Sequence, residues 1–353
     1  MSPDPLRVAL IGYGFAGRTF HAPLIRATPG LSLAVIVSRD AAKVRADVPE
    51  ASVVASFDEA IEAVDVVVIA TPNDTHAPLA TAALERRKHV VVDKPFTLDL
   101  AEARALATLA QGSGRILSVF QNRRWDSDFL GARAIIAEGV LGEIVHFESH
   151  FDRYRPEVRD RWREKPGPGS GLWIDLGPHL IDQVLQLFGL PRAISASLAE
   201  QRSGAQTDDW AHAVLDYGPL RVVLHAAVLV AGGVPRMAVH GTKASWIKYG
   251  LDVQESQLLA GVRPGDASWG VDPEPGHLYD GASGSRTERS VPPGDYRQYY
   301  VQLREAIRGH AENPVSPAQA VAVMATLEAA SVSSRGGRVM LLPLTEEERA
   351  SWR

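Results

Sequence analysis

Three side chains of this sequence could handle a proton or a developing negative charge: Lys94, Asp175 and His179. An imidazole titrates near neutral pH, so His179 can accept a proton in one step and return it in another. Asp175 stands four residues earlier, where its carboxylate can orient the ring and stabilise the imidazolium. Pro178 either kinks this helix or indicates that it starts near Gly177. In both cases we expect Asp175 and His179 to face one pocket.

Simpler interpretations of these residues remain open at this point. Lys94 follows a β-branched run at residues 90–92 and could be a solvated turn lysine, although Pro95 restrains its backbone. Asp175 could be a helix cap beside an unrelated surface histidine. Asp182 adds a second carboxylate, but no second histidine follows at a suitable spacing, so we expect no metal ion.

Three glycines near the start of the chain have the spacing GxGxxG: Gly12, Gly14 and Gly17. They follow an apolar run at residues 8–11 and precede a segment that can start a helix. In this context the glycines permit a tight turn, close approach of a pyrophosphate, and close packing of helix on strand. A glycine-rich turn that binds nothing would have the same spacing. We expect a dinucleotide to contact the whole loop, namely Gly12, Tyr13, Gly14, Phe15, Ala16 and Gly17.

The residues after the second predicted strand bear on which dinucleotide binds. That strand, residues 31–37, ends at Ser38, Arg39 and Asp40. A site for NAD usually has a carboxylate at this strand end, which binds the ribose hydroxyls. A hydroxyl followed by a guanidinium suits the 2′-phosphate of NADP instead. Asp40 could still turn back to the ribose, and Arg39 could be a solvated loop charge. The sequence favours NADP, with NAD as the alternative.

Strand-like and helix-like segments alternate over the first third of the chain. Strands are predicted at residues 8–11, 31–37, 53–55, 66–70, 89–92 and 116–120. Helices are predicted from the glycine turn to about residue 27 and at 41–46, 58–63, 76–87 and 100–112. This pattern predicts a Rossmann-type doubly wound parallel sheet, whose ligands bind beyond the carboxyl ends of the strands. Further cofactor contacts are therefore expected from Thr71, Pro72, Asn73, His76, Asp93 and Lys94, although His76 could equally be a surface helix residue.

The motifs GYGFAG, ATPNDTH and DKP occur in an order that resembles the glucose-fructose oxidoreductase and inositol dehydrogenase family, Gfo/Idh/MocA. The stretch GSGLWIDLGPHLID, residues 169–182, resembles the glycine-rich segment of that family. The resemblance implies catalytic roles for Lys94, Asp175 and His179. Asp93 stands where the commoner residue of the family is Glu, so the carboxylate is kept on a shorter arm.

Longer blocks, including FQNRRWDSDF and SWIKYGLDVQE, further resemble the branch of NADP-dependent scyllo-inositol dehydrogenases. This resemblance implies a C-terminal α+β domain with a large, mainly antiparallel open sheet and helices on one face. It also implies that subunits associate through that sheet, as a homodimer or homotetramer.

Polar and aromatic side chains gather at residues 121–125, 153–155 and 161–163. Planar polar groups suit vicinal hydroxyls, and an aromatic face suits the C–H surface of a sugar or polyol. Such density is also typical of a nucleic-acid groove, but the acids at positions 126, 128, 157, 160 and 164 would cancel a phosphate footprint. We expect Asn122, Trp162 and Arg163 beside the nicotinamide. The expected substrate contacts are Lys94, Asn122, Arg153, Tyr154, Asp175 and His179.

Length and composition limit the remaining possibilities. A chain of 353 residues suggests two domains, which we place at residues 1–121 and 122–340, followed by a tail at 341–353. The net charge of -5 predicts no general attraction to nucleic acid or to anionic membranes. The absence of cysteine excludes disulfides, thiolate zinc sites and cysteine nucleophiles. We recognise neither a signal peptide nor a membrane-spanning run, so the cytoplasm is expected.

The second part of the chain is predicted to contain strands at residues 211–217, 220–229 and 237–241 and helices at 296–308 and 317–334. Residues 261–289 are rich in Gly, Pro, Ser and Asp and predict a long surface excursion. Together these features predict an NADP(H)-dependent oxidoreductase that interconverts a secondary alcohol and a ketone on a cyclic polyol or sugar. A reductase or dehydrogenase of another sugar, such as an anhydroketose or an aldose, is the nearest alternative. A non-catalytic dinucleotide-binding sensor is a further one, although a sensor needs no proton acceptor.

Overall fold

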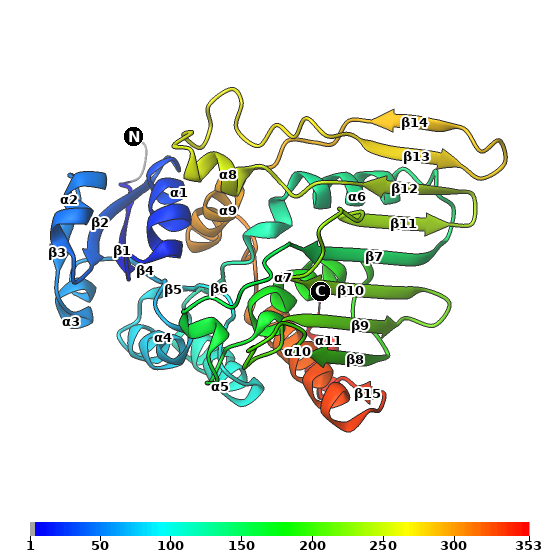
Figure 1. The fold of residues 1–353 in the computed structure, drawn as a ribbon. Helices are drawn as coiled ribbons and strands as arrows, with labels where there is room; N and C mark the ends of the chain where they lie inside the picture. Colours follow the sequence, from blue (N-terminus) through cyan, green and yellow to red (C-terminus); the bar gives the residue numbers. More distant parts are fainter. Residues whose placement is uncertain (1–3, 353) are drawn as a thin grey trace. The chain divides into compact units, whose positions relative to one another are not determined.

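The computed structural model describes residues 4–352, which form two compact units (Figure 1). The first unit contains the residues up to Asn122 together with Gln254–Trp269 and Asp295–Val321. The second contains Arg123–Val253, Gly270–Gly294 and the residues from Ala322 onward. The chain therefore returns twice to the first unit, whereas the sequence analysis assigned both returning segments to the second domain.

The first unit is built on a six-stranded sheet in which every neighbouring pair of strands is parallel. Its strands are β1 (Leu6–Ile11), β2 (Leu31–Val37), β3 (Ser52–Val54), β4 (Val66–Ile69), β5 (His89–Val92) and β6 (Leu117–Val119). Their spatial order is β3-β2-β1-β4-β5-β6, so the order reverses between β1 and β4. All four residues of β4 are buried, as expected for a strand covered on both faces. The predicted doubly wound parallel sheet is confirmed.

Short polar side chains start several helices of this unit. Asp40, Ser56 and Asp99 each accept a hydrogen bond from the backbone N–H three residues later, which fixes where the helix begins. Gly114 ends the longest helix in the left-handed conformation. The helices are η1 (Gly17–His21), α1 (Ala22–Arg26), α2 (Ala41–Asp47), α3 (Phe57–Ile61), η2 (Asn73–Thr75), α4 (His76–Glu85) and α5 (Leu100–Ser113).

The later segments join the first unit because they complete its core. They contain α8 (Gln254–Leu259) and α9 (Arg297–Ile307). Tyr299 and Tyr300 are fully buried. The Tyr299 hydroxyl donates to Oγ of Ser118 at 2.9 Å, and the Tyr300 hydroxyl lies 2.6 Å from Nδ1 of His21. Aromatic residues near the end of the chain thus fill the space beside β6 and η1.

The second unit is built on a nine-stranded sheet with the order β14-β13-β12-β11-β7-β10-β9-β8-β15. Only β7 and β10 are parallel, so the sheet is mainly antiparallel, as expected. Its strands are β7 (Ile144–Asp152), β8 (Ala193–Ala199), β9 (Trp210–Asp216), β10 (Arg221–Ala227), β11 (Met237–Gly241), β12 (Ala244–Lys248), β13 (Gly276–Asp280), β14 (Arg286–Arg289) and β15 (Met340–Leu341). The helical elements with most of their residues in this unit are η3 (Asn122–Trp125), α6 (Ser127–Ala137), η4 (Trp162–Glu164), α7 (Leu172–Phe188), α10 (Pro317–Gly336) and α11 (Glu346–Ala350).

The two faces of this sheet differ along β7. Phe147, Ser149 and Phe151 are buried, and the ring of Phe188 at the end of α7 packs 5.4 Å from the ring of Phe147. The alternate residues of β7 are partly exposed on the other face. We call this other face the open face, defined by His146, Glu148, His150 and Asp152 on β7, His212 on β9, His225 on β10 and His240 on β11.

Two strands lie where the sequence predicts only a surface excursion. β13 and β14 pair antiparallel, and all four residues of β14 are exposed. Most of the segment is exposed, as predicted, but its strands were missed, because an edge strand exposed on both sides carries no alternation of apolar and polar residues. The segment predicted as a tail, residues 341–353, contains the second residue of β15, which pairs with β8, and the short helix α11.

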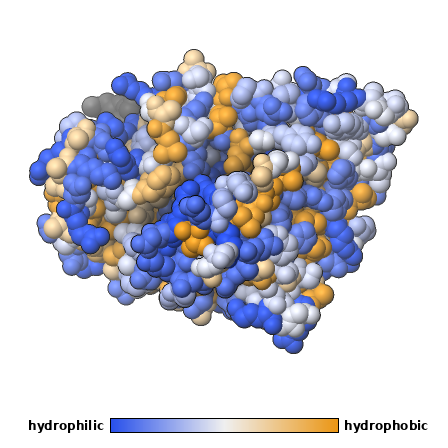
Figure 2. Space-filling view, viewed as in Figure 1, coloured by the Kyte–Doolittle hydropathy of each residue, from blue (hydrophilic) through white to orange (hydrophobic). Residues whose placement is uncertain are grey.

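Within residues 4–352, no helix is both long enough and apolar enough to cross a membrane. On the face drawn in Figure 2, hydrophilic and hydrophobic residues are intermixed.

Candidate functional site

The carboxyl ends of five strands form one edge of the parallel sheet. Val37, Ile11, Ile69, Val92 and Val119 are successive partners across β2, β1, β4, β5 and β6. The reversal of strand order between β1 and β4 lies at this edge, which is where doubly wound sheets bind ligands. The predicted cofactor residues of the first unit follow these strand ends: Gly12, Tyr13, Gly14, Phe15, Ala16, Gly17, Ser38, Arg39, Thr71, Pro72, Asn73, His76, Asp93, Lys94 and Asn122.

The three glycines of the turn have different surroundings. Gly12 has a φ of +98°, and a Cβ there would lie 2.6 Å from the carbonyl oxygen of Ala70. A Cβ on Gly17 would lie 2.2 Å from the carbonyl oxygen of Gly12. A Cβ on Gly14 would meet nothing within 4 Å, and the helix starts at the next residue. Protein packing therefore requires Gly12 and Gly17, whereas Gly14 leaves open space before a helix N-terminus, which fits a pyrophosphate.

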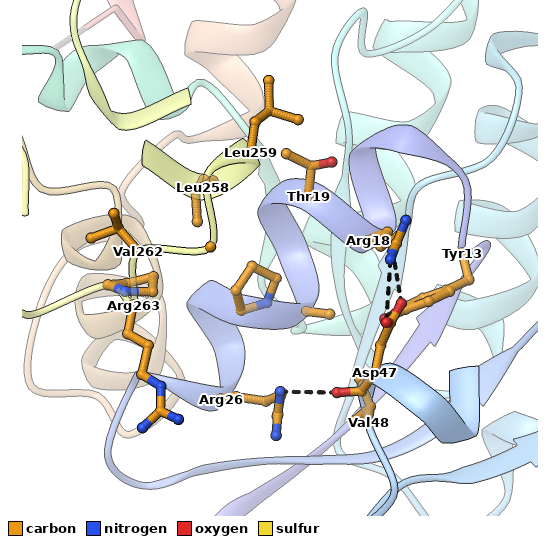
Figure 3. A pocket seen from close by; sticks show the side chains of 14 residues that line it. Tyr13, Arg18, Thr19, Arg26, Asp47, Val48, Leu258, Leu259, Val262 and Arg263 are labelled. Atoms are coloured by element: carbon orange, nitrogen blue, oxygen red, sulfur yellow. Dashed lines mark hydrogen bonds and ion pairs between the residues drawn. The ribbon is translucent and has the colours of Figure 1, made fainter. Parts of the chain in front are cut away.

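The side chain of Tyr13 is fixed by contacts with the protein. Its buried hydroxyl donates to Oδ2 of Asp47 at 3.3 Å, and Nε of Arg18 donates to the same oxygen at 2.7 Å (Figure 3). Burial and the Asp47 carboxylate raise the pKa of Tyr13 to about 12. The three residues line a pocket of about 380 Å³, with the segment after α8 on its other side (Figure 3). The Tyr13 side chain is thus engaged within the protein.

Of the residues after β2, Arg39 is an exposed cation and Asp40 caps the next helix. Arg39 is exposed, and within residues 4–352 its guanidinium makes no hydrogen bond or ion pair. Asp40 accepts the backbone N–H of Lys43 at 3.0 Å and so caps α2. Oγ of Ser38 accepts the backbone N–H of Asp40 at 3.1 Å. The carboxylate that could bind ribose hydroxyls is therefore engaged, and the guanidinium is available.

Asp93 and Lys94 are held by a chain of polar contacts. Oδ1 of Asp93 accepts the backbone N–H of Lys94 at 2.8 Å and lies 3.9 Å from Nε2 of His21. The other ring nitrogen of His21 bonds to the Tyr300 hydroxyl. Burial opposes ionisation of Asp93, but His21 and Lys94 outweigh it and hold its pKa below the ordinary value. The sequence analysis missed His21 and Tyr300, because they are far apart in the chain and share no local motif.

His76 joins two turns at the same edge. It is buried, with Nδ1 2.9 Å from the carbonyl oxygen of Pro95 and Nε2 3.1 Å from that of Thr71. Both ring nitrogens are therefore used within the protein. His76 fixes the turn after β4 against the turn that carries Lys94.

The second unit holds Asp175 and His179 in the first two turns of α7. The helix starts at Leu172, where Gly171 adopts a φ of +100°, and it continues through Pro178 to Phe188. The suggested start near Gly177 is wrong, because Asp208 accepts the backbone N–H of Trp173 at 2.6 Å and caps the helix earlier. Proline within the helix removes one backbone donor without ending it. Asp175 and His179 are thus one turn apart on one helix face.

A buried network fixes α7 one turn beyond His179. Nε and Nη2 of Arg124 donate to the two oxygens of Asp182 at 2.8 and 2.7 Å. Arg236 donates to Gln183 at 2.9 Å and to Asp128 at 3.1 Å. The sequence analysis treated Arg124 as part of a polyol cluster and did not pair it with Asp182. A signal was present, since a carboxylate among buried apolar residues of a helix needs a partner.

Arg163 and Trp162 lie beside Asp175. Nε of Arg163 is 3.5 Å from Oδ1 of Asp175, and its guanidinium lies 4.5 Å from the ring centre of Trp162. The Asp175 side chain is 22% exposed, so the pair is accessible to a ligand. Arg153 and Tyr154 follow the end of β7; the guanidinium of Arg153 packs over the Phe151 ring at 4.9 Å, and Tyr154 is exposed.

Two family models match this chain. The model described as the NAD-binding Rossmann fold of an oxidoreductase family, GFO_IDH_MocA, matches residues 6–121. The model of the C-terminal alpha/beta domain of the same family matches residues 133–342. Together they cover most of both units.

Individual relatives agree with the family models. The chain is 54% identical to the uncharacterized oxidoreductase YdgJ of Escherichia coli over 92% of this chain and 95% of that protein. It is 39% identical to the scyllo-inositol 2-dehydrogenase (NADP(+)) IolW of Bacillus subtilis over 96% of each chain. The crystal structure of an oxidoreductase from Klebsiella pneumoniae superposes with a TM-score of 0.94 at 55% identity, over 99% of this chain and 98% of that one. With an NAD-binding Rossmann unit and the C-terminal alpha/beta domain both present, this chain belongs to the Gfo/Idh/MocA family of oxidoreductases.

Proposed function

We propose that this oxidoreductase uses NADP(H) to interconvert a secondary alcohol and a ketone on a cyclic polyol or sugar, with scyllo-inositol as the foremost candidate substrate. The observation that carries the proposal is the pair Asp175 and His179, one turn apart at the start of α7, where the Asp175 side chain is 22% exposed and His179 is 5% exposed. An acid and an imidazole in this arrangement suit the removal of a hydroxyl proton. The substrate class follows the name of the Bacillus subtilis relative.

Each residue has a separate task in this reaction. His179 accepts the hydroxyl proton during oxidation and returns it during reduction. Asp175 orients the imidazole and stabilises its cationic form. Lys94 supplies a fixed positive charge to the oxygen on which negative charge develops. The loop at Gly14 and the guanidinium of Arg39 would hold the nucleotide, which would supply the hydride acceptor for oxidation and the hydride donor for reduction, so that the alcohol would lose one hydride and one proton. Asn122, Arg153, Tyr154, Trp162 and Arg163 are the proposed contacts to the nicotinamide and the substrate hydroxyls.

The choice of NADP rests on the end of β2. Arg39 offers an exposed guanidinium, while Asp40 is engaged as the cap of α2. A guanidinium binds a phosphate group through a planar set of donors, whereas NAD has no phosphate there to bind. We also propose, from the family resemblance, a homodimer or homotetramer that forms through the nine-stranded sheet.

The test is turnover of both nucleotides with a panel of inositol isomers, inososes and monosaccharides. We expect reduction of NADP with a cyclic polyol and little reduction of NAD. His179→Ala should retain the dissociation constant for NADP and lose about two to four orders of magnitude in kcat. The matched control is His310→Ala, which removes an exposed histidine of the first unit and should leave kcat unchanged. Near-normal turnover by His179→Ala would move the proton transfer to another residue, whereas no turnover of any polyol or sugar by the unchanged protein would favour a non-catalytic sensor.

A further inference from the structure

Strand pairing brings three histidines together on the open face of the nine-stranded sheet. His225 of β10 is the direct partner of His150 on the parallel strand β7. On its other side His225 pairs with His212 of β9. Asp152, two residues beyond His150, lies on the same face because side chains alternate along a strand. None of these residues belongs to the proposed catalytic machinery.

Asp152 presents one carboxylate oxygen to each of two imidazoles. Its Oδ2 lies 3.3 Å from Nδ1 of His150, and its Oδ1 lies 3.7 Å from Nε2 of His225. One ligand atom from each of the three residues fits within a group no wider than 4.8 Å. Tetrahedral ligands at about 2.0–2.1 Å from a zinc ion are about 3.3 Å apart. Small rotations of the two rings would therefore bring all three atoms to coordination distance.

One oxygen of the Asp152 carboxylate lacks a hydrogen-bond donor, whereas the other, Oδ2, bonds to Nδ1 of His150 at 3.3 Å. The Asp152 side chain is only 7% exposed, and its Oδ1 accepts no hydrogen bond. A buried carboxylate oxygen without a donor is unfavourable unless an ion or a donor completes its surroundings. Nε2 of His225, 3.7 Å from Oδ1, is too far away to serve as that donor, and Nδ1 of His150 bonds to Oδ2.

The outer nitrogens of both rings are held as in known metal sites. Nε2 of His150 lies 2.9 Å from Oε2 of Glu148, which can accept its proton and leave Nδ1 free to coordinate. Nδ1 of His225 lies 3.3 Å from Nδ1 of His212. His212 can accept a hydrogen bond from Nδ1–H of His225, which leaves Nε2 of His225 free to coordinate. A histidine that binds a metal usually donates its other N–H in this way. Both rings can thus take the tautomer that coordination requires.

We propose that His150, Asp152 and His225 bind one divalent transition-metal ion of the zinc class, with Glu148 and His212 as positioning residues. Two imidazoles and one carboxylate suit zinc or cobalt better than magnesium or calcium, which prefer oxygen ligands. Three protein ligands leave a coordination position for water. The expectation that the chain binds no metal concerned Asp175, His179 and Asp182, and it could not include residues that only strand pairing brings together.

The experiment uses the full chain without an affinity tag, stripped of metal with a chelator and titrated with Zn²⁺ and Co²⁺. We expect one Zn²⁺ per chain in competition with a chromophoric chelator, and a visible Co²⁺ absorption band that Zn²⁺ abolishes. His225→Ala and Asp152→Asn should weaken Zn²⁺ binding at least a hundredfold. His212→Ala should weaken it about ten- to a hundredfold, as for other outer partners of metal ligands.

The control variant is His240→Ala, which removes a histidine of the same face that bonds to Ser245 instead. It should bind Zn²⁺ as the unchanged protein does, and millimolar Mg²⁺ should not compete. Melting curves in chelator identify variants that fail to fold. If His225→Ala does not fold, Asp152→Asn, which keeps the shape of the side chain, provides the test. Absence of stoichiometric Zn²⁺ binding, or equal binding by Asp152→Asn and His240→Ala, would overturn the proposal.

Discussion

At the scale of single residues, the glycine turn separates protein packing from ligand binding. Gly12→Ala would place a methyl group 2.6 Å from the carbonyl oxygen of Ala70 at a φ of +98°, so we expect loss of stability. Gly14→Ala meets nothing in the protein within 4 Å, so the melting temperature should hardly change. Because its methyl group would occupy the space before the helix, the dissociation constant for the nucleotide should rise at least tenfold.

Melting curves and nucleotide titrations of the two variants decide this point. The expected result is a low melting temperature for Gly12→Ala and weak binding at normal stability for Gly14→Ala. If Gly14→Ala binds both NADP and NAD as the unchanged protein does, the open space at this position is not where the pyrophosphate lies.

Residue types and spacing were sufficient to predict which residues gather at the strand ends, but not their partners. Gly12, Ser38, Thr71 and Lys94 follow strands whose order the motif implies, so their shared edge was predictable. The hydrogen bonds between His76 and two carbonyl oxygens were not predictable, because they depend on how two turns pack together.

At the scale of elements, α7 depends on a cap whose charge is unfavourable. Burial, and next the neighbouring Asp209, raise the pKa of Asp208 to about 6, although backbone hydrogen bonds from Trp173 and Leu172 oppose the rise. A carboxyl group with a raised native pKa stabilises the fold fully below its unfolded pKa of 3.8. That contribution is lost as the pH rises through about 6. Ionisation should therefore cost about 3 kcal/mol at most by neutral pH.

Asp208→Asn removes this titration and keeps an oxygen that can accept the Trp173 N–H. We expect the free energy of unfolding of the variant, relative to the unchanged protein, to improve between pH 4 and pH 7. Denaturant titrations at several pH values measure it. The comparison is Asp160→Asn, because hydrogen bonding to Lys165 lowers the pKa of that exposed carboxylate and no gain is expected. A stability difference for Asp208→Asn that does not vary with pH would contradict the assignment.

Elements were predictable where at least one face is buried and hard to recognise where both faces are exposed. The runs of β4 and β5 were recognisable because parallel strands are almost continuously apolar. β14 was missed because all its residues are exposed. The start of α7 was misplaced because its cap, Asp208, lies far along the chain from the helix it serves.

At the scale of the whole molecule, each compact unit is built from segments that are separate in the sequence. The family motifs end near residue 121, yet Asp295–Val321 belongs to the first unit. No local sequence pattern predicts that this segment belongs to the first unit, since α9 has the pattern of any amphipathic helix. The tyrosines of α9 are recognisable as core residues only when β6 and η1 are seen beside them.

This return predicts that the nucleotide-binding segment does not fold by itself. A fragment of residues 1–122 would lack Tyr299, Tyr300, Leu303 and Val315, which are all buried in the first unit. Removing a large buried side chain costs about 2–5 kcal/mol, and a whole domain is stable by only about 5–15 kcal/mol. Loss of four such side chains should therefore exceed the available stability.

We expect the fragment to lack a cooperative thermal transition, to bind a dye for exposed apolar surface, and not to bind NADP. The comparison is the full chain with Tyr300→Phe, which loses only the hydroxyl bonded to His21 and should still melt cooperatively and bind NADP. A fragment that melts cooperatively near the temperature of the full chain would mean that the returning segments cover a core that is already complete.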